Sequence, residues 1–133
     1  MGDLSTHFST DEFACPHCKK CSISGALIVA LEKLRALGPE PIIIHDGYRC
    51  PEHNTQVGGA KKSEHMEGIA ADLHIQGLSL QQQYDRAKQI LEFVNGGIGV
   101  YDGNFIHVDV RDGKARWSRK NGVYLGLDVL VTP

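Results

Sequence analysis

The sequence lacks the features of a membrane-spanning or exported protein. No apolar run approaches the roughly 18 residues that a bilayer-spanning helix needs. Residues 1–5 show no basic segment followed by an apolar one, which is the pattern of a secretory signal peptide. We therefore expect no membrane partner, and synthesis in the cytoplasm without a signal peptide. The formal net charge of -2 offers no basic surface for a phosphate backbone, so we expect no nucleic-acid partner.

Several common functional motifs are also missing. Gly97 and Gly99 begin a dinucleotide-binding fingerprint, but Asp102 stands where its third glycine is required. Neither the zinc-protease helix motif with two histidines around a glutamate nor a serine nucleophile elbow occurs. The chain has no internal repeat, low-complexity tract or linker. With 133 residues, 41% of them hydrophobic and 23% charged, it has the size and composition of one soluble globular domain over residues 1–133. We expect it to be a monomer.

Hydrophobic periodicity indicates an α+β fold. We predict helices over 24–37 and 81–93, strands over 41–45 and 69–75, and a hairpin over 98–110. The β-branched strand at 41–45 is expected to be buried on both faces. Asp102-Gly103 predicts a two-residue hairpin loop. Residues 51–64 are rich in turn formers and are expected to form an irregular connection, and the tail from Trp117 has no clear pattern. The sum is a small domain with an antiparallel sheet and flanking helices.

Two histidines and one aspartate form a candidate metal site. His65 lies in a glycine-punctuated loop, Asp72 follows on a predicted strand, and His107 lies on the predicted hairpin. Such a set suits zinc with one position left open for a catalytic water. The alternative from the residues alone is that loop histidines and a salt-bridged strand aspartate serve the structure.

These residues stand in motifs that resemble a known family. Ser63-x-His65-x-x-Gly68-x-Ala70-x-Asp72, a later His107-Val108-Asp109, and Gly47-Tyr48-Arg49 upstream look like the M15 metallopeptidases. That group includes D-Ala-D-Ala carboxypeptidases and phage endolysins, and it shares a fold with the hedgehog signalling domain. The resemblance spans roughly residues 8–117. It implies that His65, Asp72 and His107 bind zinc, and that the substrate is a peptidoglycan stem peptide.

The resemblance also implies residues that bind the substrate. Arg49 would hold a terminal carboxylate with its planar fork of donors, or it would form a structural ion pair. Ser63 would contact substrate or orient the His65 loop, or it would be a turn-forming serine. Asp46 stands where the family usually has a serine, and its carboxylate would weaken anionic substrate binding or neutralise Arg49.

The general base departs from the family pattern. Many relatives carry an acid three residues before the last histidine ligand, where this sequence has Asn104. Asp109 lies two residues after His107 on the same strand face, so we rank it first as the base, with orientation of His107 as its alternative role. Asp102 ranks second, because an aspartate in a hairpin loop can also be present for its turn geometry.

Four cysteines form a second candidate metal site. Cys15, Cys18 and Cys21 lie in one polar, knuckle-like loop, and Cys50 follows Arg49. Four thiolates are the composition of a closed structural zinc site, and cytoplasmic synthesis disfavours disulfides. Reduced thiols and a Cys15–Cys50 bridge are the alternatives.

The sequence thus predicts a zinc-dependent peptidase that hydrolyses bonds in peptidoglycan stems, as a carboxypeptidase or an endolysin-type endopeptidase. The competing hypothesis is a non-catalytic zinc domain that binds a cell-wall peptide or a protein partner. The enzyme would reach the wall through a holin or on a phage particle. Tyr101, Phe105 and Trp117 are candidates for a pocket lining or for the core.

Overall fold

The fold is built on one six-stranded sheet with the strand order β1-β2-β4-β3-β5-β6. The computed structural model describes residues 2–59 and 63–133. The strands are β1 (Ile42–Asp46), β2 (Ala70–Ile75), β3 (Gly97–Tyr101), β4 (Phe105–Asp109), β5 (Ala115–Lys120) and β6 (Val123–Leu125). Neighbouring strands are antiparallel except β3 and β5, which are parallel.

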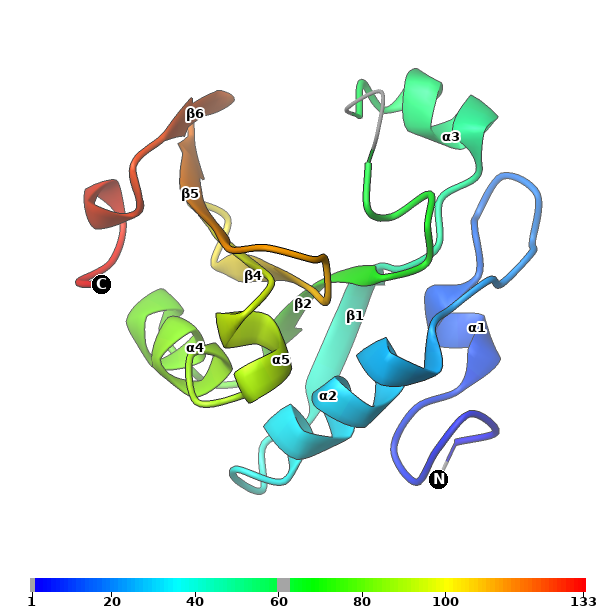
Figure 1. Cartoon of the computed structure of the whole chain (residues 1–133), viewed down its shortest axis with the longest axis horizontal. Coiled ribbons are helices and arrows are strands. Elements are labelled where there is room, and N and C mark those ends of the chain that lie inside the picture. Colours follow the sequence, from blue (N-terminus) through cyan, green and yellow to red (C-terminus); the bar gives the residue numbers. More distant parts are fainter. Residues whose placement is uncertain (1, 60–62) are drawn as a thin grey trace.

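Helices lie on both sides of this sheet. They are α1 (Thr10–Phe13), α2 (Gly25–Arg35), α3 (Pro51–Gln56), α4 (Leu80–Ala87), α5 (Leu91–Val94) and a 3-10 turn, η1 (Leu127–Val129). Helices α2, α4 and α5 lie on one side of the sheet, whereas α3 and β6 rise on the other (Figure 1). The predicted α+β fold, with a mostly antiparallel sheet and flanking helices, is therefore confirmed.

The side-chain alternation of the central strands separates core from site. Leu73, Ile98, Ile106 and Val108 are fully buried in the core cluster beneath the helices. Their neighbours along each strand point to the opposite face, because successive strand residues alternate. Asp72 on β2 and His107 on β4 are direct cross-strand partners on that opposite face. The sheet thus fixes a carboxylate and an imidazole side by side.

Both long predicted helices form, but the second is broken. Ser24 caps α2 by accepting a hydrogen bond from the Ala26 N–H. The segment predicted as one helix over 81–93 is split into α4 and α5 by an extended Ile90. The break buries both Ile90 and Phe93 and leaves Leu91 67% exposed. Core packing therefore overrides the regular helical periodicity at this point.

Two further expectations differ from the structure. β1 is an edge strand and Ile43 is 42% exposed, so the prediction that this strand is buried on both faces is wrong. The hairpin forms, but Tyr101 pairs with Phe105, so its loop is 102–104 and the left-handed residue is Asn104 (φ 62). A three-residue loop that ends in a left-handed residue is the next most common hairpin connection.

The segment 51–64 is not irregular throughout as expected, because it begins with the helix α3. Pro51 occupies the first turn, where its missing N–H costs nothing. Positions 60–62 of that segment lie outside the described residues. Among the described residues, no helix has the length and apolar character needed to span a membrane. The folded chain exposes 6928 Å² of surface, close to the roughly 6,900 Å² that size scaling gives.

Candidate metal centre and cleft

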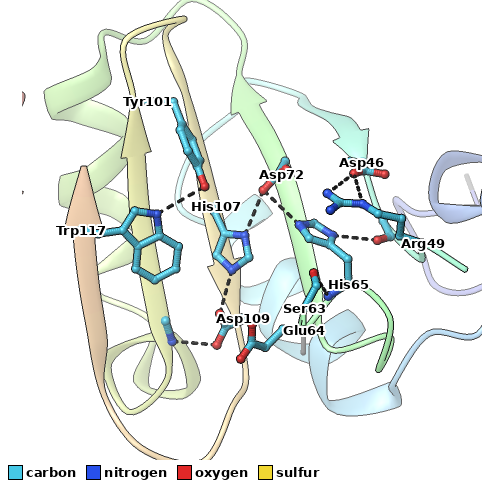
Figure 2. Close-up of polar contacts among 12 residues, drawn as sticks. Asp46, Arg49, Ser63, Glu64, His65, Asp72, Tyr101, His107, Asp109 and Trp117 are labelled. Atoms are coloured by element: carbon cyan, nitrogen blue, oxygen red, sulfur yellow. Dashed lines mark hydrogen bonds and ion pairs between the residues drawn. The ribbon is translucent and has the colours of Figure 1, made fainter. Parts of the chain in front are cut away.

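Three side chains converge above the centre of the sheet. His65 comes from the turn over 64–68, immediately before β2, while Asp72 and His107 come from β2 and β4. The Asp72 Oδ1 atom lies 3.3 Å from His65 Nε2 and 3.0 Å from His107 Nδ1 (Figure 2). The structure therefore brings together the three residues that the sequence singled out as metal ligands.

The spacing of these atoms fits a tetrahedral metal. Zinc bonds to nitrogen and oxygen run about 2.0–2.2 Å, so the edge of such a tetrahedron is about 3.3–3.6 Å. The distances from Asp72 Oδ1 to His65 Nε2 and His107 Nδ1, 3.3 and 3.0 Å, are equal to or slightly shorter than that edge length. Two imidazoles and one carboxylate leave a fourth position, which is the composition of a catalytic zinc site.

Each histidine is held through its outer ring nitrogen. His65 Nδ1 lies 2.8 Å from the Gly47 carbonyl oxygen, and His107 Nε2 lies 2.7 Å from Asp109 Oδ2. Because a carbonyl or carboxylate accepts the ring proton, the inner nitrogen of each imidazole keeps its lone pair for a metal. Both rings are buried, so these contacts also fix their orientation.

The local electrostatics favour a cation among these ligands. Burial would raise the pKa of Asp72, but contacts with His107 and His65 hold it well below its usual range. Burial would lower the pKa of His107, but hydrogen bonds to Asp109 and Asp72 raise it to about 9. Two carboxylates around one imidazole thus stabilise positive charge, from a proton or from a metal ion.

Asp109 is enclosed on all sides. It is 0% exposed, and its Oδ1 accepts hydrogen bonds from the N–H groups of Gly97 and Arg111 at 2.8 and 3.0 Å. Its Oδ2 faces His107 and the Arg111 guanidinium, both at 2.7 Å. Burial would raise its pKa, but the contacts with His107 and Arg111 hold the pKa far below its usual range. The geometry is that of a carboxylate that orients an imidazole.

A cleft of about 640 Å³ lies over the three ligands. Trp117 forms one wall: its ring lies 5.0 Å from that of His107, and its Nε1 donates to the Tyr101 hydroxyl at 3.3 Å. Burial and the nearby Asp72 charge raise the pKa of Tyr101, so this hydroxyl stays protonated at neutral pH. The polar lining includes Asp46, Arg49, Ser63, Glu64, Asp102, Arg111 and Arg119.

Arg49 lines the cleft but already has partners. Its Nη2 and Nε both approach Asp46 Oδ2, at 2.6 and 3.1 Å, and its Nη1 donates to Asn54 Oδ1 at 2.8 Å. The Arg49 side chain is only 11% exposed. Asp46, the residue that departs from the family pattern, therefore occupies one edge of the guanidinium fork (Figure 2).

The other predicted site residues lie at different depths. Ser63 is buried, and its Oγ accepts the His65 N–H at 3.2 Å, which ties it to the shape of the His65 turn. Asp102 is exposed at the rim of the cleft and accepts the Asn121 N–H at 2.9 Å. Ser63 and Asp102 thus both line the cleft, and neither belongs to the ligand triad.

Two arginines and a glutamate also line the cleft, although no sequence motif indicates them. Arg111 braces Asp109 and lies 3.3 Å from Glu64, while Arg119 lines the far wall. Arg111 follows Asp109 by two residues, a spacing that places the two on the same side of an extended chain and is the signal that could have found it. Arg119 and Trp117 reach the cleft only through the β3–β5 pairing, which no local pattern predicts.

Three of the four cysteines gather elsewhere, between the N-terminal loop and the start of α3. The Sγ atoms of Cys15, Cys18 and Cys50 all lie within 4.8 Å of one another, and all are free thiols. Cys21 does not belong to this group. The structure therefore supports a three-cysteine cluster, and a four-cysteine site stays a prediction.

Comparisons with known proteins agree with this geometry. The family described as Peptidase M15 matches residues 6–109, and the chain belongs to that family. It is 36% identical over 96 residues to the peptidoglycan L,D-endopeptidase MepK of Escherichia coli K12. It is 37% identical over 98 residues to the zinc D-Ala-D-Ala carboxypeptidase of Streptomyces albus G.

These two relatives are longer proteins. The aligned region covers 66% of this chain and 51% of the Escherichia coli protein, and 68% of this chain and 37% of the Streptomyces protein. The chain thus spans about half the length or less of the curated relatives it matches. The family match ends at Asp109, before β5 begins.

Proposed function

We propose that the protein is a zinc-dependent peptidase that hydrolyses a peptide bond in peptidoglycan stem peptides. The observation that carries the proposal is the convergence of His65 Nε2, Asp72 Oδ1 and His107 Nδ1 at tetrahedral spacing beneath an open cleft. The two relatives are named for an endopeptidase and a carboxypeptidase, and the first name specifies peptidoglycan. Both names support this substrate class.

Three residues would bind the metal, and neighbouring groups would orient the two histidine rings. His65, Asp72 and His107 supply the ligand atoms, while the Gly47 carbonyl and Asp109 fix the two rings. When bound, zinc supplies Lewis-acid chemistry, which lowers the pKa of a water molecule towards ~7 and polarises a peptide carbonyl. Asp109 keeps the outer His107 nitrogen protonated, so the inner nitrogen is the one whose lone pair would bind the metal.

We assign the general base to Asp102. Asp109 is fully enclosed and already hydrogen-bonded to His107 and Arg111. This favours its alternative role, in which it orients His107 and is not the general base. Asp102 lies in the same hairpin loop as Asn104, the position at which relatives carry an acid, and it faces the cleft. Its exposed side chain is open to a water molecule in the cleft.

Arg49 would bind the substrate's carboxylate. Arg49 lines the same cleft as the three candidate ligands, and a guanidinium can hold a carboxylate bidentately. The substrate carboxylate must compete with Asp46 for the same fork. We therefore expect weaker binding of free terminal carboxylates than an unpaired arginine would give.

The direct test is digestion of purified peptidoglycan, followed by mass analysis of the released muropeptides. We expect cleavage products from the zinc-loaded protein, and none after chelation or in His65→Ala. The masses identify the bond as D-Ala-D-Ala, L,D or L-Ala-D-Glu. Binding of peptidoglycan without any new product, by a protein shown to contain zinc, would contradict the proposal and favour a non-catalytic binding domain.

A second digestion assigns the base. Asp102→Asn should lower kcat by about 10²–10⁴-fold, which is the typical contribution of a general base, with unchanged zinc content. Glu64→Gln is the matched control, since Glu64 also lines the cleft but is paired with Arg111. If Glu64→Gln is the inactive variant and Asp102→Asn is active, the assignment of Asp102 is wrong.

A further inference from the structure

The three-cysteine cluster joins two distant parts of the chain. Cys15 and Cys18 lie in the loop after α1, and Cys50 directly precedes α3. Cys15 is 0% and Cys50 8% exposed. The catalytic machinery described above uses none of the three thiols.

The sulfur spacing matches metal ligation and not a disulfide. The Sγ atoms of Cys15 and Cys50 are 3.6 Å apart. Two thiolates on a tetrahedral zinc, with Zn–S bonds of about 2.3 Å, are separated by about 3.8 Å, whereas a disulfide needs about 2.05 Å. With the Cys18 Sγ within 4.8 Å of both, the three sulfurs can form one face of such a tetrahedron.

A ring nitrogen lies beside one sulfur of the cluster, although His17 is not among the residues whose ligand atoms all lie within 4.8 Å of one another. His17 Nδ1 is 3.6 Å from Cys50 Sγ, and a sulfur and a nitrogen on one tetrahedral zinc are separated by about 3.5 Å. His17 Nε2 lies 3.7 Å from Glu52 Oε2, and carboxylates often hold the outer nitrogen of metal-bound histidines. We propose that Cys15, Cys18 and Cys50 hold a structural zinc, separate from the catalytic one, and that the His17 ring turns towards the other two sulfurs to supply the fourth ligand.

The backbone around the sulfurs is already arranged for thiolates. The N–H of Cys50 points to Cys15 Sγ at 3.5 Å, and the N–H of His53 points to Cys50 Sγ at 3.4 Å. Such donors stabilise negative charge on sulfur. Lys19 adopts φ 65, and its N–H bonds the Cys15 carbonyl at 2.8 Å, which closes a tight turn around the first two cysteines.

The site would stabilise the residues beside Cys50. Arg49 precedes Cys50 directly, and Gly47, whose carbonyl holds His65, lies three residues before it. The Tyr48 N–H also bonds the Phe13 carbonyl. A zinc that joins Cys50 to Cys15 and Cys18 therefore fastens this segment to the N-terminal loop and maintains the position of the carboxylate-binding arginine.

Zinc stoichiometry of the full chain, purified under reducing conditions, tests the proposal. Inductively coupled plasma mass spectrometry should find about two zinc ions in the wild type and about one in each of His65→Ala and Cys18→Ser. Cys21→Ser is the matched control and should keep both ions, because Cys21 lies outside the cluster. His17→Ala should release the second zinc to a competing chelator at least about tenfold more readily.

Cobalt substitution gives a readout that does not depend on how the cysteine variants fold. In the His65→Ala background, Co²⁺ should produce a thiolate-to-metal charge-transfer band, which only sulfur ligands give. Three results would each overturn the site: one zinc in the wild type that His65→Ala removes, a cobalt spectrum without the sulfur band, or loss of the second zinc in Cys21→Ser. A failure of peptidoglycan cleavage would leave these measurements unaffected.

Discussion

Asp109 shows how one buried side chain sets the properties of a metal ligand. Its carboxylate joins the His107 ring to Arg111 and to the Gly97 N–H. A charged acceptor at Nε2 makes the ring a stronger donor at Nδ1 and prevents it from rotating. We therefore expect Asp109 to act on zinc affinity more than on proton transfer.

We predict that Asp109→Asn lowers zinc affinity by about 10–100-fold, the range found when the hydrogen-bond partner of a metal-bound histidine is altered. The amide keeps the shape but not the charge, so the loss is measured by competition with a chromophoric chelator. Asp102→Asn is the control and should bind zinc as the wild type does. Equal zinc affinity in the two variants, with Asp109→Asn inactive when fully loaded, would return Asp109 to the role of base.

A pair of substitutions tests the carboxylate subsite. Arg49→Lys should raise KM for peptides with a free terminal carboxylate, because an ammonium cannot reproduce the bidentate fork. Asp46→Asn should lower KM for the same peptides, because it removes the competing charge at Arg49 Nη2. Steady-state kinetics on a free and an amidated peptide separate the effects. An unchanged KM in both variants would place Arg49 outside the subsite.

At this scale the sequence was most informative where residues stand in motifs. His65, Asp72 and His107 could be named because their motif spacing resembles a family. Arg111 and Trp117 could not, since the roles of both depend on contacts made only in the folded chain. The pairing of Arg49 with Asp46 was foreseen from the unusual acid at position 46, but not the additional contact with Asn54.

The N-terminal segment is held to α2 by one carboxylate. Glu32 accepts hydrogen bonds from the Ser5 hydroxyl at 2.5 Å and the His7 N–H at 2.7 Å, and His7 Nδ1 lies 2.6 Å from its other oxygen. Burial raises the pKa of Glu32, but these contacts outweigh it and lower the pKa overall. The segment before α1 therefore depends on an ionised side chain.

We predict that acid loosens this segment first. Because the folded pKa of Glu32 is lowered, its stabilisation is complete above the unfolded value, about 4.3, and is lost as pH falls through the folded pKa. Hydrogen exchange should show residues 4–9 losing protection at acidic pH. Glu32→Gln should lose about 1–2 kcal/mol at neutral pH and remove this pH dependence. The same acid response in both proteins would contradict the role of Glu32.

The contact between β3 and β5 requires a glycine at position 99. A Cβ at Gly99 would overlap the indole ring of Trp117, which lies across the parallel strand pair. Gly99→Ala should therefore displace the only tryptophan of the chain, shift its fluorescence maximum and raise KM, while zinc affinity stays constant. Gly113→Ala is a control for backbone effects, since it has open space but φ 93. An unchanged emission spectrum in Gly99→Ala would contradict this packing.

The elements show where local patterns stop being sufficient. The hairpin and α2 follow from turn chemistry and periodicity, which act between near neighbours. The break at Ile90 and the strand β5 do not follow from such local patterns. Ile90 interrupts the helix because it packs in the core, and Ala115–Lys120 forms a strand because it pairs with β3. The helix at Pro51–Gln56 carried its own signals, a proline in the first turn and Glu52 beside it, but its turn-rich surroundings obscured them.

For the whole molecule, metal binding and folding should be coupled. A ligand that binds only the native state at 1,000 times its Kd stabilises it by about 4 kcal/mol, and each kcal/mol shifts Tm by about 3–5 °C at this chain length. Chelation should therefore lower Tm by roughly 10–20 °C for one tightly bound zinc. Calorimetry with and without added zinc measures the shift, and His65→Ala should show a smaller one. A Tm that does not respond to chelation would argue against tight zinc binding.

The cleft draws its two walls from separate stretches of sequence. The strands that carry the candidate metal ligands lie within residues 6–109, whereas Trp117, Arg119 and Tyr124 come from β5 and β6, beyond the region that the family matches. In the sheet, these two strands are connected to the rest through β3 alone. We therefore expect that directed evolution confined to residues 117–124 changes which ligands the cleft accepts, while the candidate metal ligands stay the same.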